Sequence, residues 1–128
     1  MKVIQLRTPK TGLLDITKKV SVIAAECKIL NGMCQVFVPH TTAGITINEN
    51  ADPDVIDDML AAFEEMVPKL RYLHSEGNSA AHVKASLVGA SVTVPIVNGK
   101  LYLGTWQGIY FCEFDGPRQR SVCINILG

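Results

Sequence analysis

The sequence lacks an excess of charge of either sign. Lysine and arginine together number 12, aspartate and glutamate together also number 12, and the formal net charge is therefore zero. Proteins that bind nucleic acid or anionic membranes through general electrostatic attraction carry a basic surface. We therefore expect neither nucleic acid nor a membrane as a partner. A near-neutral chain with 48% hydrophobic residues is also prone to self-association, which favours an oligomer.

The sequence also lacks long apolar runs and closely paired cysteines. No run approaches 18 apolar residues, and the start, M-K-V-I-Q-L-R-T, has no apolar segment of the kind found in signal peptides. The four cysteines, Cys27, Cys34, Cys112 and Cys123, form no C-x-x-C pair. Three of them lie in strand-like runs, so we expect reduced thiols rather than disulfides. These absences predict a cytoplasmic protein.

What the sequence does contain is the pattern of one α+β domain. A chain of 128 residues can bury one core, and we expect a single domain over residues 1–128. Periodicity predicts strands at residues 2–8, 33–38, 44–48, 92–96, 100–103, 108–114 and 120–127. Helices are predicted from about residue 16 to a stop at Asn31-Gly32, from 53 to 67, and from 80 to 87.

These elements predict a fold class as well as a local structure. The helices fill the middle of the chain, and an antiparallel meander fills the last third, with Asn98-Gly99 as its strongest hairpin signal. The strand at 33–38 is rich in Val, Phe and Cys and is predicted to be buried on both faces. We expect a mainly antiparallel curved sheet, open barrel or sandwich, covered by two to three helices.

Three segments concentrate the side chains able to carry chemistry. Residues 38–54 form a dense polar cluster around a short apolar run, residues 74–84 hold two of the three histidines, and residues 103–109 hold the only tryptophan. We predict that the three segments close around one polar site.

The three histidines, His40, His74 and His82, all lie in turn-like or helix-start segments. Three histidines are the protein ligands of an open zinc site, which keeps its fourth position for water or substrate. Their spacing of 34 and then 8 residues matches no local metal signature. The alternative is three independent histidines that lie at the surface or hydrogen-bond locally.

Two further groups suit an anionic ligand. Thr41 and Thr42 follow a predicted strand and can bind an anion through hydroxyl and backbone N–H groups, or they only complete the turn. Lys84 lies near a helix start, where free N–H groups favour phosphate, although it equally suits a solvated helical face.

Other polar residues of these segments have competing interpretations. Asn48 and Asn50 have no evident structural task and are candidates for the site. Asp52 precedes Pro53 and is most simply a helix cap. One interpretation is that Trp106 stacks on a heteroaromatic ring while Gln107 hydrogen-bonds to the edge of that ring. The alternative is that Trp106 fills the core at a bulge.

The same segments resemble a known family. The blocks H-T-T-A-G-I-T-I-N-E-N-A-D-P-D-V, H-S-E-G-N-S-A-A-H-V-K-A-S-L and G-K-L-Y-L-G-T-W-Q-G-I-Y resemble, in this order, the YjbQ-like family of small bacterial and archaeal proteins. The resemblance covers nearly the whole chain. It implies a compact α+β fold, usually a homotrimer, and secondary thiamine-phosphate synthase activity. That reaction joins a pyrimidine methyl diphosphate to a thiazole phosphate and releases pyrophosphate.

The resemblance and the residue patterns together predict roles for particular side chains. The predicted metal ligands are His40, His74 and His82, and the metal is a divalent ion, zinc or magnesium. The predicted catalytic residues are Asn50, Asp52, Lys84 and Gln107, and the predicted substrate-binding residues are Thr41, Thr42, Asn48 and Trp106. Arg118 or Arg120 are further cations that suit a departing pyrophosphate. The substrate is expected to be small and phosphorylated or heteroaromatic.

The chemistry leaves two alternatives beside the synthase. Three histidines suit zinc and hydrolysis better than magnesium, which prefers oxygen ligands. One alternative is therefore a metal-dependent hydrolase of a small substrate. The other is a non-enzymatic module that binds a metal or a small molecule.

Overall fold

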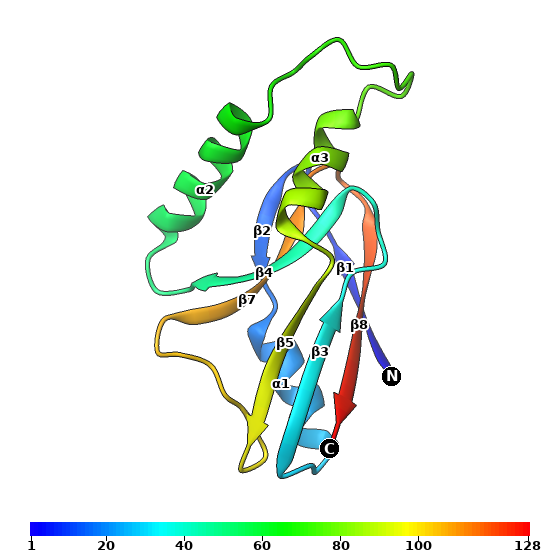
Figure 1. The fold of residues 1–128 in the computed structure, drawn as a ribbon. Helices are drawn as coiled ribbons and strands as arrows, with labels where there is room; N and C mark the ends of the chain where they lie inside the picture. Colours follow the sequence, from blue (N-terminus) through cyan, green and yellow to red (C-terminus); the bar gives the residue numbers. More distant parts are fainter.

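Two antiparallel sheets and three helices make up the fold, which a computed structural model describes over residues 1–128 (Figure 1). In chain order the elements are β1 (Lys2–Arg7), β2 (Gly12–Asp15), α1 (Thr17–Glu26), β3 (Asn31–Phe37), β4 (Ala43–Glu49), α2 (Pro53–Met66), α3 (Ser79–Val88), β5 (Ser91–Val97), β6 (Lys100–Leu101), β7 (Gln107–Glu113) and β8 (Gln119–Leu127). The larger sheet has the strand order β1-β8-β3-β5-β6, and the smaller has the order β2-β7-β4. The predicted α+β class with a curved antiparallel sheet is confirmed.

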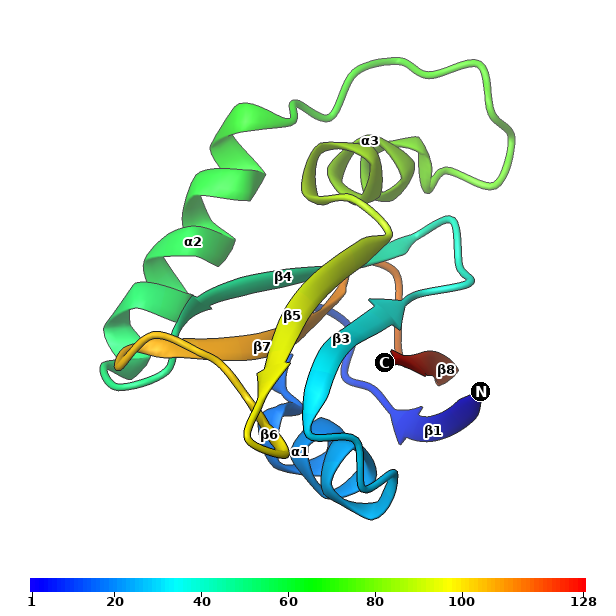
Figure 2. The same cartoon turned by 60° about the horizontal axis from the view of Figure 1, so that its bottom comes forward.

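The main core lies between the two sheets and α1 (Figure 2). Alternation along β1 turns Ile4 and Leu6 inward, and Val122 and Ile124 of β8 do the same on the neighbouring strand. Val20 of α1 packs against them and is fully buried. Each such side chain contributes about 1.5–3 kcal/mol when it is removed from water, so this shared core ties both sheets together.

The opposite face of the smaller sheet is covered by α3 and part of α2. Cys112 and Phe114 of the β7 segment pack against Ala81 and Ala85 of α3. The ring of Phe63 from α2 meets Phe114 edge to face, with centroids 5.6 Å apart. Because both of its faces are covered, β7 is buried along almost its whole length. This layer holds α3, the helix that carries His82, against the smaller sheet.

Helix α2 is less buried than its pattern of apolar residues predicts. None of its residues is fully buried, and Ile56, Met59, Leu60 and Phe63 are only half-buried. Figure 1 shows why, since α2 runs beside the smaller sheet rather than between layers. No helix of the protein is long and apolar enough to cross a membrane.

Several local signals are confirmed and others are not. Asn98 and Gly99 both take positive φ, 51° and 79°, as the predicted hairpin turn requires. The first helix ends early, at Glu26, because Lys28 adopts a left-handed conformation with φ of 56°. Asn31 and Gly32 therefore belong to β3 instead of capping a helix.

The strand predicted at residues 33–38 is buried on one face only, so that prediction is wrong. Cys34 and Val36 point into the core, whereas Met33 and Phe37 are exposed on the outer face of the larger sheet. A short apolar run in a sequence is compatible with two kinds of strand. One is covered on both faces, and the other leaves the apolar side chains of its outer face exposed in the single chain.

Candidate functional site

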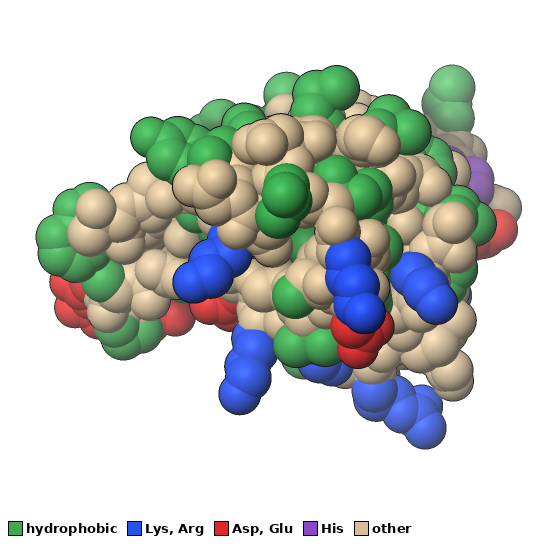
Figure 3. Space-filling model, turned by 90° about the horizontal axis from the view of Figure 1, so that it is seen from below, with side chains coloured by type: hydrophobic (Ala, Val, Ile, Leu, Met, Phe, Trp, Pro, Cys, Tyr) green, Lys and Arg blue, Asp and Glu red, His purple; other side chains and the backbone are tan.

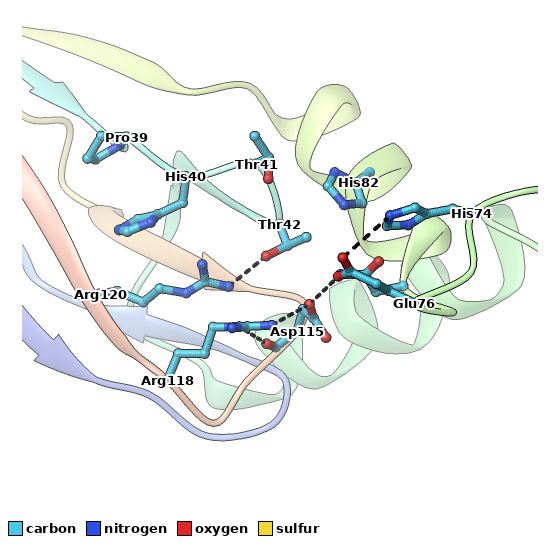
Figure 4. Close-up of a pocket in the computed structure, with 11 residues that line it drawn as sticks. Pro39, His40, Thr41, Thr42, His74, Glu76, His82, Asp115, Arg118 and Arg120 are labelled. Atoms are coloured by element: carbon cyan, nitrogen blue, oxygen red, sulfur yellow. Dashed lines mark hydrogen bonds and ion pairs between the residues drawn. The ribbon is translucent and has the colours of Figure 1, made fainter.

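A pocket of about 440 Å³ lies where the β3–β4 turn, the segment before α3 and the β7–β8 turn meet (Figure 4). Apart from Pro39, every side chain that lines it is polar or charged. The polar lining consists of His40, Thr41, Thr42, His74, Glu76, Asn78, His82, Asp115, Arg118 and Arg120. The predicted grouping of the three histidines with Thr41 and Thr42 therefore occurs at this end of the molecule.

The turn from His40 to Thr42 forms one wall of the pocket. It is anchored on both sides, because the N–H of Val38 donates to the carbonyl of Ala90 at 2.8 Å and the N–H of Phe114 donates to the carbonyl of Thr42 at 3.2 Å. The backbone N–H groups of His40, Thr41 and Thr42 donate to no protein acceptor. Three successive free N–H groups are a feature of backbone sites that bind anions.

A buried ion pair lies beneath this turn. Nε of Arg120 donates to Oε1 of Glu113 at 2.7 Å, and Nη2 donates to Oε2 at 2.5 Å. Glu113 is fully buried, and it also accepts hydrogen bonds from the Thr8 hydroxyl and from the N–H of Asp115. Burial alone would raise the pKa of the Glu113 carboxyl, but these hydrogen bonds outweigh it and hold the pKa below its usual value.

The ion pair fixes how Arg120 faces the pocket. Its Nη2 donates a further hydrogen bond to the Thr42 hydroxyl at 2.9 Å, whereas its Nη1 has no hydrogen-bond partner in the protein. Arg120 is only 5% exposed, and Figure 4 places its guanidinium group between His40 and Thr42. A buried guanidinium with one unused nitrogen at a pocket wall is a ready donor for a ligand.

His40 is held as a neutral hydrogen-bond donor. The backbone N–H of Ser121 donates to its Nε2 at 2.9 Å, so Nε2 carries no proton and the proton of the neutral ring lies on Nδ1. Burial, followed by the nearby Arg120 guanidinium, lowers the pKa of His40 below its ordinary value of 6.5. At neutral pH the ring therefore remains uncharged.

His74 and His82 form a pair at the rim. Their rings meet edge to face, with centroids 5.7 Å apart and an interplanar angle of 81°. Nε2 of His74 lies 3.9 Å from Oε1 of Glu76, the third titratable group at this rim (Figure 4). The pair therefore lines one edge of the polar pocket.

Asp115 and Arg118 complete the opposite wall. The Asp115 carboxylate accepts hydrogen bonds from Nδ2 of Asn78 at 2.8 Å and from Nη2 of Arg118 at 3.1 Å. Burial opposes ionisation of Asp115, but these two contacts and the charges of Arg118 and Arg120 lower its pKa. The carboxylate thus balances the charge of Arg118, much as Glu113 balances that of Arg120.

The predicted three-histidine metal site is not formed. No group of three or more His, Cys, Asp or Glu residues is placed to hold a metal ion. Nε2 of His40 already accepts a backbone hydrogen bond, and the rings of His74 and His82 meet edge to face. The divalent-metal cofactor itself stays a prediction, without this set of ligands.

A second group of predicted site residues lies at the other end of β4. Glu49 pairs with Gln107, and the N–H of Asn50 donates to the carbonyl of Trp106 at 2.8 Å. Since β4 has seven residues, this end lies roughly 20 Å from the His40 turn. Within one chain the three predicted segments therefore divide between two places. Trp106 is 62% exposed rather than buried in the core.

Local contacts already occupy several of these polar side chains. Oδ1 of Asp52 accepts from the N–H of Asp54 at 2.9 Å and caps α2. Oδ1 of Asn48 accepts from the N–H of Glu49, and Oε1 of Gln107 accepts from the N–H of Gly104. Catalytic or binding roles for these residues stay predictions.

Lys84 lies on α3 but does not line the histidine pocket. It is buried and pairs with Glu64 of α2, and this hydrogen bond lowers the pKa of the Glu64 carboxyl. Both residues line a separate pocket of about 420 Å³ between α2 and α3. Its predicted catalytic role is untested, and its contact with Glu64 ties the two helices together.

Glu113 is the residue of this site that the sequence patterns did not single out. It follows the apolar run G-I-Y-F-C and is the one charged residue of β7. A lone carboxylate in an otherwise apolar strand is a signal of a buried polar contact, because an unpaired buried charge is very costly. Its partner Arg120 lies seven positions later, across the D-G-P turn.

Known proteins of several organisms are similar to this chain over nearly its whole length. A family model described as UPF0047 protein YjbQ-like matches residues 2–128. UPF0047 protein YugU of Bacillus subtilis is 54% identical, covering 100% of this chain and 99% of that protein. A UPF0047 protein of Methanocaldococcus jannaschii is 51% identical, covering 97% of this chain and 91% of that protein.

Solved structures agree with these similarities. The crystal structure of an uncharacterised YjbQ/UPF0047 protein from Clostridium acetobutylicum has a TM-score of 0.96 at 53% identity and covers 99% of this chain and 100% of that chain. A protein of unknown function from Sulfolobus solfataricus has a TM-score of 0.94 at 36% identity, covering 99% and 95%.

These findings correct the predicted function. The hydrolase prediction depended on a metal held by His40, His74 and His82, and that ligand set is absent. The synthase prediction came from the family resemblance. The similar proteins are uncharacterised or of unknown function, and none of their names gives thiamine-phosphate synthase activity. The predictions of a thiamine-phosphate synthase, of a metal-dependent hydrolase and of a module that binds a metal through these histidines are therefore wrong.

Proposed function

The chain belongs to the YjbQ-like UPF0047 family, and from that membership and the pocket geometry we propose that it binds a small phosphorylated molecule beside Arg120 and exchanges protons with it through His82. The observation that carries the proposal is the unpartnered Nη1 of the buried Arg120, next to three free backbone N–H groups. The Thr41 hydroxyl and Nδ1–H of His40 are further donors at the same wall.

The number of donors favours a phosphate group over a carboxylate. A phosphate ester presents three oxygens that are not in the ester bond, and each accepts more than one hydrogen bond. The preference for an anion comes from oriented donors rather than from net charge, because Glu113 and Asp115 balance Arg120 and Arg118. The donors are fixed before a ligand arrives, so binding costs little ordering of the protein.

His82 supports proton exchange by its place between the pocket and α3. It lines the polar pocket, and His74 packs against its ring. An imidazole ring can both accept and donate a proton, which suits a group with this role. Replacement of His82 by Gln should leave phosphate binding in place while removing turnover of a phosphorylated substrate.

Calorimetric titration with inorganic phosphate tests the binding step. Thr41 is exposed, so Thr41→Val removes one donor with little effect on folding, and we expect phosphate affinity to fall about tenfold. Thr93→Val is the matched control, because Thr93 is an exposed strand residue outside the pocket. An absence of phosphate binding at millimolar concentration in the wild type, or equal losses in the two variants, would contradict the proposal.

A further inference from the structure

A second hollow adjoins the polar pocket on the side of α3. It has a volume of about 470 Å³ and shares His40, Thr41 and His82 with the polar pocket. Its other lining residues are Ala43, Ala85, Ser86, Gly89 and Ala90. None of these five carries a charge, and none is larger than serine. The two hollows therefore meet at the same three residues but differ in chemistry.

β4 approaches the end of α3 closely beside this second hollow. A Cβ on Gly44 would lie 2.8 Å from the carbonyl oxygen of Gly89, so the two backbones pack at a distance that only glycine allows. The N–H of Ile45 donates to the same Gly89 carbonyl at 3.1 Å. Gly89 itself has φ of 98°, and a Cβ added there would meet no atom within 4 Å. The C-terminal end of α3 therefore borders the open hollow at Gly89, while the Gly89 carbonyl is held by β4.

We infer that this second hollow, the Ser86 pocket, holds the uncharged organic group of a phosphate monoester whose phosphate lies beside Arg120. The inference rests on the proposed function and adds the class of ligand to it. Charged groups line only the Arg120 side, whereas alanine and glycine line the α3 side. A ligand with an anionic end and a compact uncharged body matches both linings, and its ester oxygen would lie near His40 and His82.

The chemistry of the shared residues supports this orientation. His40 is uncharged and donates from Nδ1, so it can contact a bridging or phosphate oxygen without adding a charge to the Ser86 pocket. Hydrophobic contact with small side chains stabilises an uncharged body in proportion to the apolar area removed from water. Inorganic phosphate would use only the Arg120 side, and a phosphate ester would use both.

Calorimetric titration of the protein with inorganic phosphate and with phenyl phosphate distinguishes binding beside Arg120 from binding in the Ser86 pocket. We expect the wild type to bind phenyl phosphate about tenfold more tightly than inorganic phosphate, because only the ester reaches the Ser86 pocket. Ser86→Phe places a large ring in that pocket and should abolish the advantage of phenyl phosphate while inorganic phosphate binds as before. Leu87→Phe is the matched control, since Leu87 is the next residue of α3, is 59% exposed and lines no pocket.

The outcomes distinguish this inference from the proposed function. If inorganic phosphate binds but phenyl phosphate binds no more tightly, or if Ser86→Phe keeps the advantage, the Ser86 pocket is not the subsite. If the wild type binds neither probe, the proposed function fails together with the inference. Thermal unfolding followed by circular dichroism checks that the Ser86→Phe variant is folded. If that variant does not fold, Ala90→Phe replaces it in the titration, because Ala90 lines the same pocket at an exposed position.

Discussion

At the scale of single residues, the Glu113–Arg120 pair is the contact on which both stability and the site depend. Both side chains are buried, and the carboxylate accepts from Arg120, Thr8 and the backbone of Asp115. Removing one partner leaves an unpaired buried charge, which is far more costly than replacing both. The pair therefore orients Nη1 of Arg120 and makes the fold sensitive to its loss.

The first prediction tests this asymmetry. Arg120→Met should lower the free energy of unfolding by about 3–5 kcal/mol, because it leaves the Glu113 carboxylate buried without its cation. The double variant Glu113→Leu with Arg120→Met should recover a large part of that loss. Urea denaturation measures both, and equal destabilisation of the single and double variants would show that the buried charge is not the cause.

A second prediction concerns the pH dependence of stability. The pKa of His40 is lower in the folded protein than its ordinary value of 6.5, so the unfolded chain binds the proton more readily. This contribution to stability is complete above pH 6.5 and is lost as the pH falls toward the lowered pKa. Glu113 also has a lowered pKa, and its contribution is present above about pH 4.5 and is lost at more acidic pH.

Urea midpoints measured between pH 7.5 and 5.5 isolate the histidine. Gln at position 40 can still accept the Ser121 N–H through its amide oxygen but does not titrate, so His40→Gln should lose less stability over this range than the wild type. Identical slopes in the two proteins would assign the pH dependence to other groups.

At the scale of elements, α2 combines a side-chain cap at its N-terminus with partial packing of its apolar side chains. Its apolar side chains are only half-buried, while Asp52 caps the first turn and Pro53 begins the helix. Asp52→Ala should lower the free energy of unfolding by about 1 kcal/mol, visible as a lower midpoint of thermal unfolding. Asp57→Ala, an exposed position inside the same helix, should have little effect.

The Asp52 variant also separates the two interpretations of this residue. Because Asp52 lies at the far end of β4 from Arg120, a role as a cap alone predicts unchanged phosphate affinity. A loss of affinity larger than the loss of stability explains would favour the catalytic role predicted from the family resemblance.

At the scale of the whole molecule, large apolar side chains remain at the surface. Val3, Met33 and Phe37 lie on the outer face of the larger sheet, where they are 48%, 51% and 40% exposed. Figure 3 shows hydrophobic side chains scattered over the face seen from below, mostly in its upper part, with basic side chains across the middle and lower part. Apolar surface of this kind is typical of a protein that associates.

The predicted homotrimer follows from the family resemblance and from this surface, and sedimentation equilibrium tests it. We expect a mass of three times the 13.9 kDa of the chain. Phe37→Glu should lower that mass, because it places a charge on the outer face of the sheet. Val22→Glu, on the exposed side of α1, should not. A wild-type monomer at micromolar concentration would refute the prediction.

Local order was largely predictable from the sequence. Alternation located β1 and β8, Asn98-Gly99 located the hairpin turn, and Asp52-Pro53 located the start of α2. These signals depend on a residue's own conformational preferences and on its near neighbours, so they need no knowledge of the rest of the chain. β2 gave no such signal, because its four residues are ordered by pairing with β7.

The sequence by itself determined which residue types are available, and the tertiary structure decided which of them meet. The gathering of His40, His74 and His82 at one pocket was foreseen, but the orientation of their rings was not. Ring orientation depends on partners such as the Ser121 N–H, 81 positions away. The pairing of Glu113 with Arg120 depends in the same way on strands that return across a turn. Hydrogen-bond geometry, unlike periodicity, is a property of the assembled fold, and it leaves the predicted three-histidine metal site unformed.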